Sequence, residues 1–202
     1  MNQIIKEKIA ASISDFHLPA YSEIPDVGLY LEQTAKYISD YLAPLQYGPV
    51  TGSMISNYVK KGLIQSPVRK QYSRDQIAYL IFIAIAKAVM SMDDLRLMMD
   101  IQRRTYTSQV AYEYFRAELD NVLEYVFGLK PDLETIGHHA TDEKIMLRNM
   151  IIAVAHKVYL DKLFAVLRAE GSIESLLTYI LNPAAALFAA GRVFLSVYFC
   201  SR

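Results

Sequence analysis

The chain of 202 residues has no tryptophan, one cysteine, 8 glycines and 7 prolines. Cys200 has no second cysteine to pair with, so an internal disulfide is excluded, which fits a reducing cytoplasm. The sequence also lacks low-complexity tracts, and 53% of its residues are hydrophobic, which excludes a disordered chain and supplies enough apolar side chains for a core. We therefore expect a globular, cytoplasmic protein.

Motifs of catalysis are missing as well. There is no glycine-rich phosphate loop, no Gly-x-Ser-x-Gly elbow and no His-Glu-x-x-His pair. The adjacent His138 and His139 have no partner cysteine, and adjacent side chains rarely converge on one metal ion. We expect no enzyme activity, no cofactor and no metal site.

A membrane-spanning segment is not expected either. The most apolar run, residues 183–200, is about as long as the shortest spanning helices, which need roughly 17 residues. Arg192 lies in its middle, where a charge costs about 2.5–3.5 kcal/mol on insertion scales. The run is apolar on nearly every side, so we expect residues 184–199 to form a helix covered by a second subunit or by the protomer's own bundle.

Carboxylates are missing from one long stretch, residues 41–74, although the whole chain balances 21 cations against 21 anions. That stretch holds five cations, which leaves 16 cations and 21 anions for the rest of the chain. A basic patch on an otherwise slightly acidic protein has the charge that a phosphate backbone attracts. The five cations are Lys60, Lys61, Arg69, Lys70 and Arg74.

The repeated pattern along the chain is helical, with apolar residues recurring every 3.6 positions and few runs of strict alternation. Gly, Pro and capping residues divide the pattern into segments. Ser73 with Gln76 forms a capping box that opens a long, almost wholly apolar helix. The predicted helices are residues 4–14, about 27–42, 51–61, 73–89, 91–99, 108–127, 141–169, 172–181 and 184–199.

The helix predicted over 51–61 has two faces. Thr51 is its expected N-cap and Gly62 its C′ residue. One stripe is apolar, and the opposite stripe carries small hydroxyls, an amide and a lysine, namely Ser53, Ser56, Asn57 and Lys60. Residues 63–72, LIQSPVRKQY, contain a proline and fit a short two-stranded wing or an extended loop.

These side chains suit the major groove of DNA. Asparagine pairs bidentately with adenine, serine bonds several base edges, and lysine meets phosphate or guanine. The alternative is that the polar stripe simply keeps a soluble helix hydrated. We predict a DNA-binding site formed by Ser53, Ser56, Asn57, Lys60, Lys61, Arg69, Lys70, Tyr72 and Arg74.

The segment MISNYVKKGLIQSPVRKQYSRDQIAYL, residues 54–80, resembles the second helix, wing and third helix of MerR-type winged helix-turn-helix regulators. Positions of that pattern are matched by Tyr58, Gly62-Leu63-Ile64, Pro67, Arg69 and Tyr72. Ser56 and Asn57 stand where that family has an Arg-Tyr pair. Over roughly residues 24–100 the chain is also similar to a bacterial family known as domain of unknown function 1836, which implies a helix-turn-helix fold in a cytoplasmic bacterial protein.

We therefore expect a mainly all-α protein with an N-terminal segment (1–23), a MerR-like helix-turn-helix domain (24–104) and a helical C-terminal dimerisation domain (105–202). The expected function is sequence-specific binding of double-stranded DNA by a homodimeric transcriptional regulator. The alternative is a protein-interaction module on the same scaffold. Tyrosines in the C-terminal half either line a pocket for a small-molecule effector or serve ordinary packing; they are Tyr106, Tyr112, Tyr114, Tyr125, Tyr159, Tyr179 and Tyr198.

Overall fold

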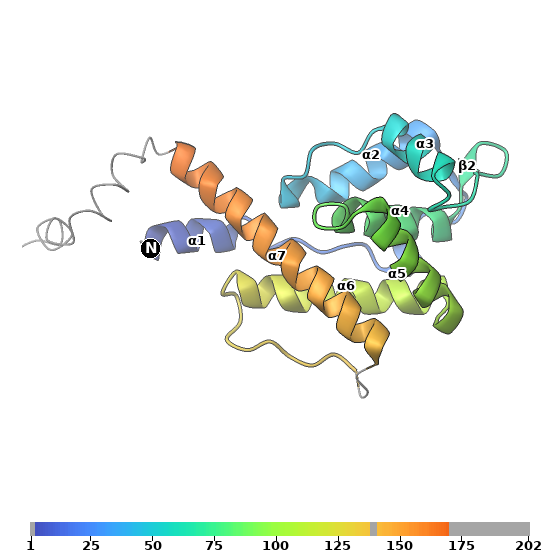
Figure 1. Ribbon diagram of the computed structural model, residues 1–202. Coiled ribbons are helices and arrows are strands. Elements are labelled where there is room, and N and C mark those ends of the chain that lie inside the picture. Colours follow the sequence, from blue (N-terminus) through green and yellow to red (C-terminus); the bar gives the residue numbers. More distant parts are fainter. Residues whose placement is uncertain (1–2, 138–140, 170–202) are drawn as a thin grey trace, which may run out of the picture. The chain divides into compact units, whose positions relative to one another are not determined.

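The computed structural model describes residues 3–137 and 141–169, and these are mainly helical (Figure 1). The chain divides into one compact unit up to Lys162 and a second from Leu163 onward. The predicted helices 172–181 and 184–199 lie outside the described residues, as does the predicted subunit interface. No helix within the described ranges is long and apolar enough to cross a membrane.

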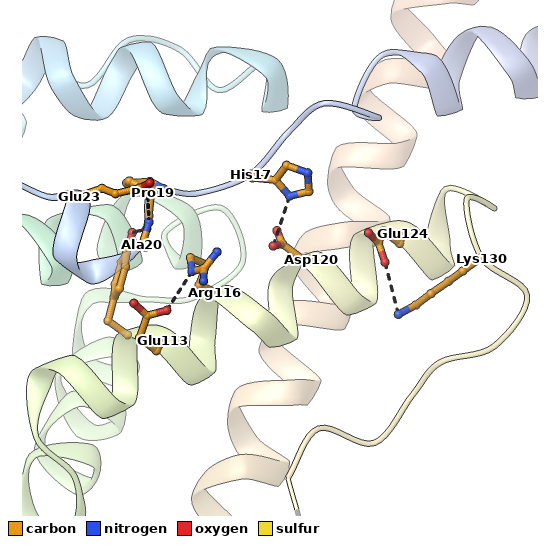
Figure 2. A network of polar contacts seen from close by, with 10 residues as sticks. His17, Pro19, Ala20, Glu23, Glu113, Arg116, Asp120, Glu124 and Lys130 are labelled. Atoms are coloured by element: carbon orange, nitrogen blue, oxygen red, sulfur yellow. Dashed lines mark hydrogen bonds and ion pairs between the residues drawn. The ribbon is translucent and has the colours of Figure 1, made fainter.

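The unit begins with α1 (Gln3–Ala11), a turn (residues 12–15), an extended strap (residues 16–20) and the short 3-10 helix η1 (Tyr21–Glu23). Figure 2 shows the strap beside α6 (Ser108–Val126), tied to its polar face. The hydroxyl of Tyr112 donates to the carbonyl of Pro19 at 3.0 Å, and His17 Nδ1 lies 3.4 Å from Asp120 Oδ2. The strap is therefore hydrogen-bonded to a helix that lies about a hundred positions later in the sequence.

Two short helices follow. β1 (Leu29–Tyr30) leads into α2 (Leu31–Leu42), and η2 (Ala43–Leu45) and a turn precede α3 (Gly52–Lys60). Ala35, Ile38 and Leu42 are buried at the helical spacing that the sequence predicts. α2 packs against α3 and α4, so these three helices share one core.

After α3, the chain returns to the strand that precedes α2. β2 (Gln71–Tyr72) pairs antiparallel with β1, with Leu29 opposite Tyr72 and Tyr30 opposite Gln71. Val68 forms a further bridge to Gln71. The loop between α3 and α4 is thus held by a two-stranded sheet whose other strand precedes α2.

α4 (Arg74–Ala86) packs against both α2 and α6. Its capping box is present, since the Ser73 hydroxyl accepts from the Gln76 N–H and the Gln76 side chain accepts from the Ser73 N–H. Seven of its side chains are buried: Ile77, Ala78, Leu80, Ile81, Ile83, Ile85 and Ala86. The prediction of an almost wholly apolar, central helix is confirmed.

The remaining helices are α5 (Met92–Thr105), α6 and α7 (Asp142–Ala169). α6 packs along α4, where the rings of Phe82 and Phe115 meet edge to face at 5.2 Å. The domain division predicted at 104/105 falls at the last residue of α5, inside the unit that runs to Lys162.

Candidate nucleic-acid interface

Apart from Met54, the exposed residues of α3 are polar, and none of them is acidic. Ser53, Ser56, Asn57 and Lys60 are all exposed, while Ile55 and Tyr58 are buried on the opposite face. The helix begins as predicted, because the Thr51 hydroxyl accepts from the Met54 N–H. Four of the side chains predicted to read or contact DNA therefore share one accessible face.

The C-terminal end of α3 is a Schellman motif. The Gly62 N–H donates to the Val59 carbonyl at 2.9 Å, and the Leu63 N–H donates to the Tyr58 carbonyl at 3.0 Å. Gly62 has a φ of 70°, a conformation that glycine adopts without a steric penalty. Lys61 lies at the C-cap and is exposed, next to Lys60 in the last turn.

A tight turn follows a few residues later. The Gln71 N–H donates to the Val68 carbonyl at 2.9 Å, and the two central residues, Arg69 and Lys70, have φ values of 50° and 65°. Positive φ at both central positions defines a type I′ turn, which favours Asn-Gly because side chains are disfavoured there. Two cations therefore occupy strained positions at an exposed tip.

These four cations carry unneutralised charge. Lys60, Lys61, Arg69 and Lys70 form no ion pair with a carboxylate of the described residues, whereas several other cations do, including Lys36, Arg116 and Lys157. A polyanion is attracted by positive charge that a neighbouring carboxylate does not already neutralise. We therefore define the basic surface as the polar face of α3, the lysines at its C-terminal end and the turn that contains Arg69 and Lys70.

Two further predicted residues have structural contacts. Tyr72 is 4% exposed and packs in the core. Arg74 Nε donates to the Ile24 carbonyl at 2.8 Å, and its guanidinium lies 5.6 Å from the ring centroid of Tyr21. Burial raises the pKa of both Tyr58 and Tyr72, so neither hydroxyl adds negative charge to the surface at neutral pH.

Sequence reasoning missed two arginines of α5. Arg96 donates to the Lys61 carbonyl, and Arg103 Nη2 donates to the Leu63 carbonyl at 2.8 Å. Both guanidinium groups therefore lie near the C-terminal end of α3, where they donate to carbonyls just beyond its last residue. The two arginines are seven residues apart, a spacing that places side chains on the same face of a helix. This spacing is the sequence signal from which they could have been predicted.

The opposite end of α3 is acidic. A Cβ built on Gly52 would lie 2.6 Å from Glu32 Oε1, so this carboxylate sits beside the first turn of the helix. An anion there is favoured by the helix dipole. A phosphate is consequently better placed near the C-terminal lysines than at the helix N-terminus.

The described chain is thus a mainly helical protein with a two-stranded sheet and an exposed basic surface after α2. Residues 19–115 match the model of a family described as Domain of unknown function (DUF1836). The match runs from the end of the strap through α2 to α5 and into α6, and it confirms the resemblance to this family predicted for residues 24–100. No curated protein and no solved structure matches the chain.

Proposed function

We propose that the protein is a sequence-specific DNA-binding transcriptional regulator. The observation that carries this proposal is the set of four exposed cations without ion pairs beside the acid-free polar face of α3. The positive charges on this surface repel one another, and the negative phosphates of a DNA backbone would neutralise that repulsion.

The proposed mechanism treats α2 and α3 as a helix-turn-helix and the loop with the type I′ turn as a short wing. In this arrangement α3 enters the major groove, where Ser53, Ser56 and Asn57 contact base edges. Lys60 and Lys61 meet phosphates at the helix end, and Arg69 and Lys70 meet phosphates from the wing. The resemblance of residues 54–80 to MerR-type regulators supports this assignment.

Two copies on a pseudo-palindromic site would double these contacts, as helix-turn-helix regulators commonly do. The apolar residues 184–199 are the proposed subunit interface, and they lie outside the described residues. Tyr72 and Arg74 have no direct role in the proposal, because their side chains serve the fold.

The test starts with selection of bound genomic DNA fragments to find the preferred site. Asn57→Ala is then expected to weaken binding to that site by about 1–3 kcal/mol and binding to random duplex very little, since one good base contact carries that much discrimination. Asn149→Ala is the matched control: Asn149 is an exposed helical asparagine on α7 whose amide donates to the Ile145 carbonyl. Equal losses on both duplexes for Asn57→Ala would mean that this side chain does not read bases.

A further inference from the structure

A cavity of about 210 Å³ lies within the first unit, between α4, α5, α6 and the first turns of α7. For comparison, an engineered apolar cavity of roughly 150 Å³ in another protein holds benzene. The present cavity is partly open, so a molecule of one or two aromatic rings has both room and a path of entry. Its walls are mostly apolar and aromatic, including Phe82, Met98, Tyr106, Tyr114 and Phe115.

Several polar groups in the wall already have partners within the protein. The Tyr79 hydroxyl donates to Gln102 Oε1 at 3.0 Å, and Gln102 Nε2 donates to the Tyr106 carbonyl at 3.0 Å. The Tyr114 hydroxyl donates to the Ile136 carbonyl at 3.3 Å, and the Lys144 ammonium lies over the Tyr114 ring at 5.0 Å. A ligand therefore meets no unsatisfied donor or acceptor among these groups, which favours an uncharged, apolar one.

The cavity wall is connected to the end of α3 by one side chain. The Arg103 guanidinium lies 4.8 Å from the ring centroid of Tyr79, and the same group donates to the Leu63 carbonyl just beyond α3. Tyr79 lines the cavity and bonds Gln102, which also lines it. A ligand that displaces the Tyr79 ring must therefore move or release the group that holds the end of α3.

We propose that this cavity binds a neutral aromatic molecule of one or two rings and that occupancy is transmitted to α3 through Tyr79 and Arg103. The binding step stands on the cavity alone, whereas its effect on DNA affinity rests on the proposed function. Three of the tyrosines considered as pocket residues from the sequence, Tyr106, Tyr112 and Tyr114, line the cavity, together with Tyr79 from α4.

The binding step is tested with prodan, a neutral naphthalene dye whose emission reports polarity, titrated into the full-length protein. Wild type is expected to bind it saturably, and Ala111→Phe, which fills the cavity, is expected to lose about tenfold or more in affinity. Ala153→Phe makes the same change on the exposed face of α7 and should bind as wild type does. Circular dichroism establishes that each variant is folded.

If Ala111→Phe does not fold, Val110→Trp replaces it, because Val110 lines the cavity and is 54% exposed. Absence of saturable binding to wild type overturns the proposal. Unchanged binding by a folded cavity-filling variant also overturns it.

The transmission step is tested by measuring DNA affinity with and without saturating indole. Indole is expected to change the affinity of wild type by about fivefold or more and to have little effect on Arg103→Met. The same indole effect in both proteins overturns transmission through Arg103. If the protein binds prodan but no DNA, the proposed function is refuted while the binding step is unaffected. In that case, transmission from the cavity to α3 is measured by the amide hydrogen exchange of residues 61–64.

Discussion

Arg69 and Lys70 adopt the left-handed backbone conformation at adjacent positions of the type I′ turn. For a residue with a β-carbon this conformation costs roughly 1–2 kcal/mol, and Asn-Gly is the sequence that suits such a turn best. The two side chains are exposed, and no ion pair within the described residues offsets the cost. Strain of this kind at an exposed, charged tip is a feature of binding sites.

The double substitution Arg69→Asn with Lys70→Gly should therefore raise the free energy of unfolding by about 1–2 kcal/mol. The same change should weaken binding to every DNA duplex, because the proposed function assigns a phosphate contact to each of the two side chains. Urea denaturation and duplex titration measure the two effects. Arg69→Ala with Lys70→Ala is the matched control: it loses the charges but keeps β-carbons in the turn, so it should weaken binding without the gain in stability.

Asp120 gives stability a pH dependence. Burial raises the pKa of its carboxyl, and the nearby His17 opposes part of that rise. A raised pKa means that the folded state binds the proton more tightly than the unfolded state does. The contribution of the protonated Asp120 carboxyl to the free energy of unfolding is thus fully present below its unfolded pKa, near 3.8. This contribution is lost as the pH rises through the folded pKa.

Asp120→Asn removes that titration. Relative to wild type, the variant is expected to gain more stability at about pH 7 than at about pH 4.5, as measured by urea denaturation at both pH values. Asp132→Asn is the control at an exposed aspartate. A gain that is equal at the two pH values would mean that the buried carboxylate is fully compensated by His17.

At the scale of elements, the ends of helices are where sequence and structure agree best. Thr51, Ser73 and Ser91 each accept a hydrogen bond from the N–H three residues later, as the capping patterns predict. These signals are local, since a cap depends on a hydroxyl and a backbone that lie within one turn. Gly62 is predicted for the same reason, because a Schellman end requires a residue that tolerates positive φ.

Gly62→Ala should lower the free energy of unfolding by about 1–2 kcal/mol, since alanine in the left-handed region is strained although space around it is open. Gly48→Ala is the control. It also has open space, but its φ lies outside the left-handed region, so the change should be neutral or stabilising by up to about 1 kcal/mol. Equal effects of the two substitutions, measured in urea, would exclude a special role for the conformation of Gly62.

At the scale of the whole molecule, the mainly helical class and the burial of α4 could be predicted because they follow from composition and period. The pairing of β1 with β2 could not, since each strand has two residues and about forty positions separate them. The position of Arg103 over Tyr79 was equally hidden, because it depends on how α5 lies against α4. The exposure of the polar residues of α3 could be predicted from the helical period. The burial of Tyr72 could not, because it depends on the pairing of β2 with β1.

The most direct measurement is the salt dependence of binding to a DNA duplex. If Lys60, Lys61, Arg69 and Lys70 each contact a phosphate, they contribute about −3.6 per subunit to the slope of log K against log salt, at roughly −0.9 per contact. Replacing all four by alanine should make the slope shallower by that amount. The control variant Lys6→Ala with Lys157→Ala, on α1 and α7, should change it little.

A wild-type affinity that does not depend on salt would contradict the proposed DNA binding and favour a protein-interaction module instead. A slope that is unchanged in the four-alanine variant would show that DNA, if bound, meets another surface. The proposed function predicts a steep wild-type slope that falls when these four cations, and not Lys6 and Lys157, are removed.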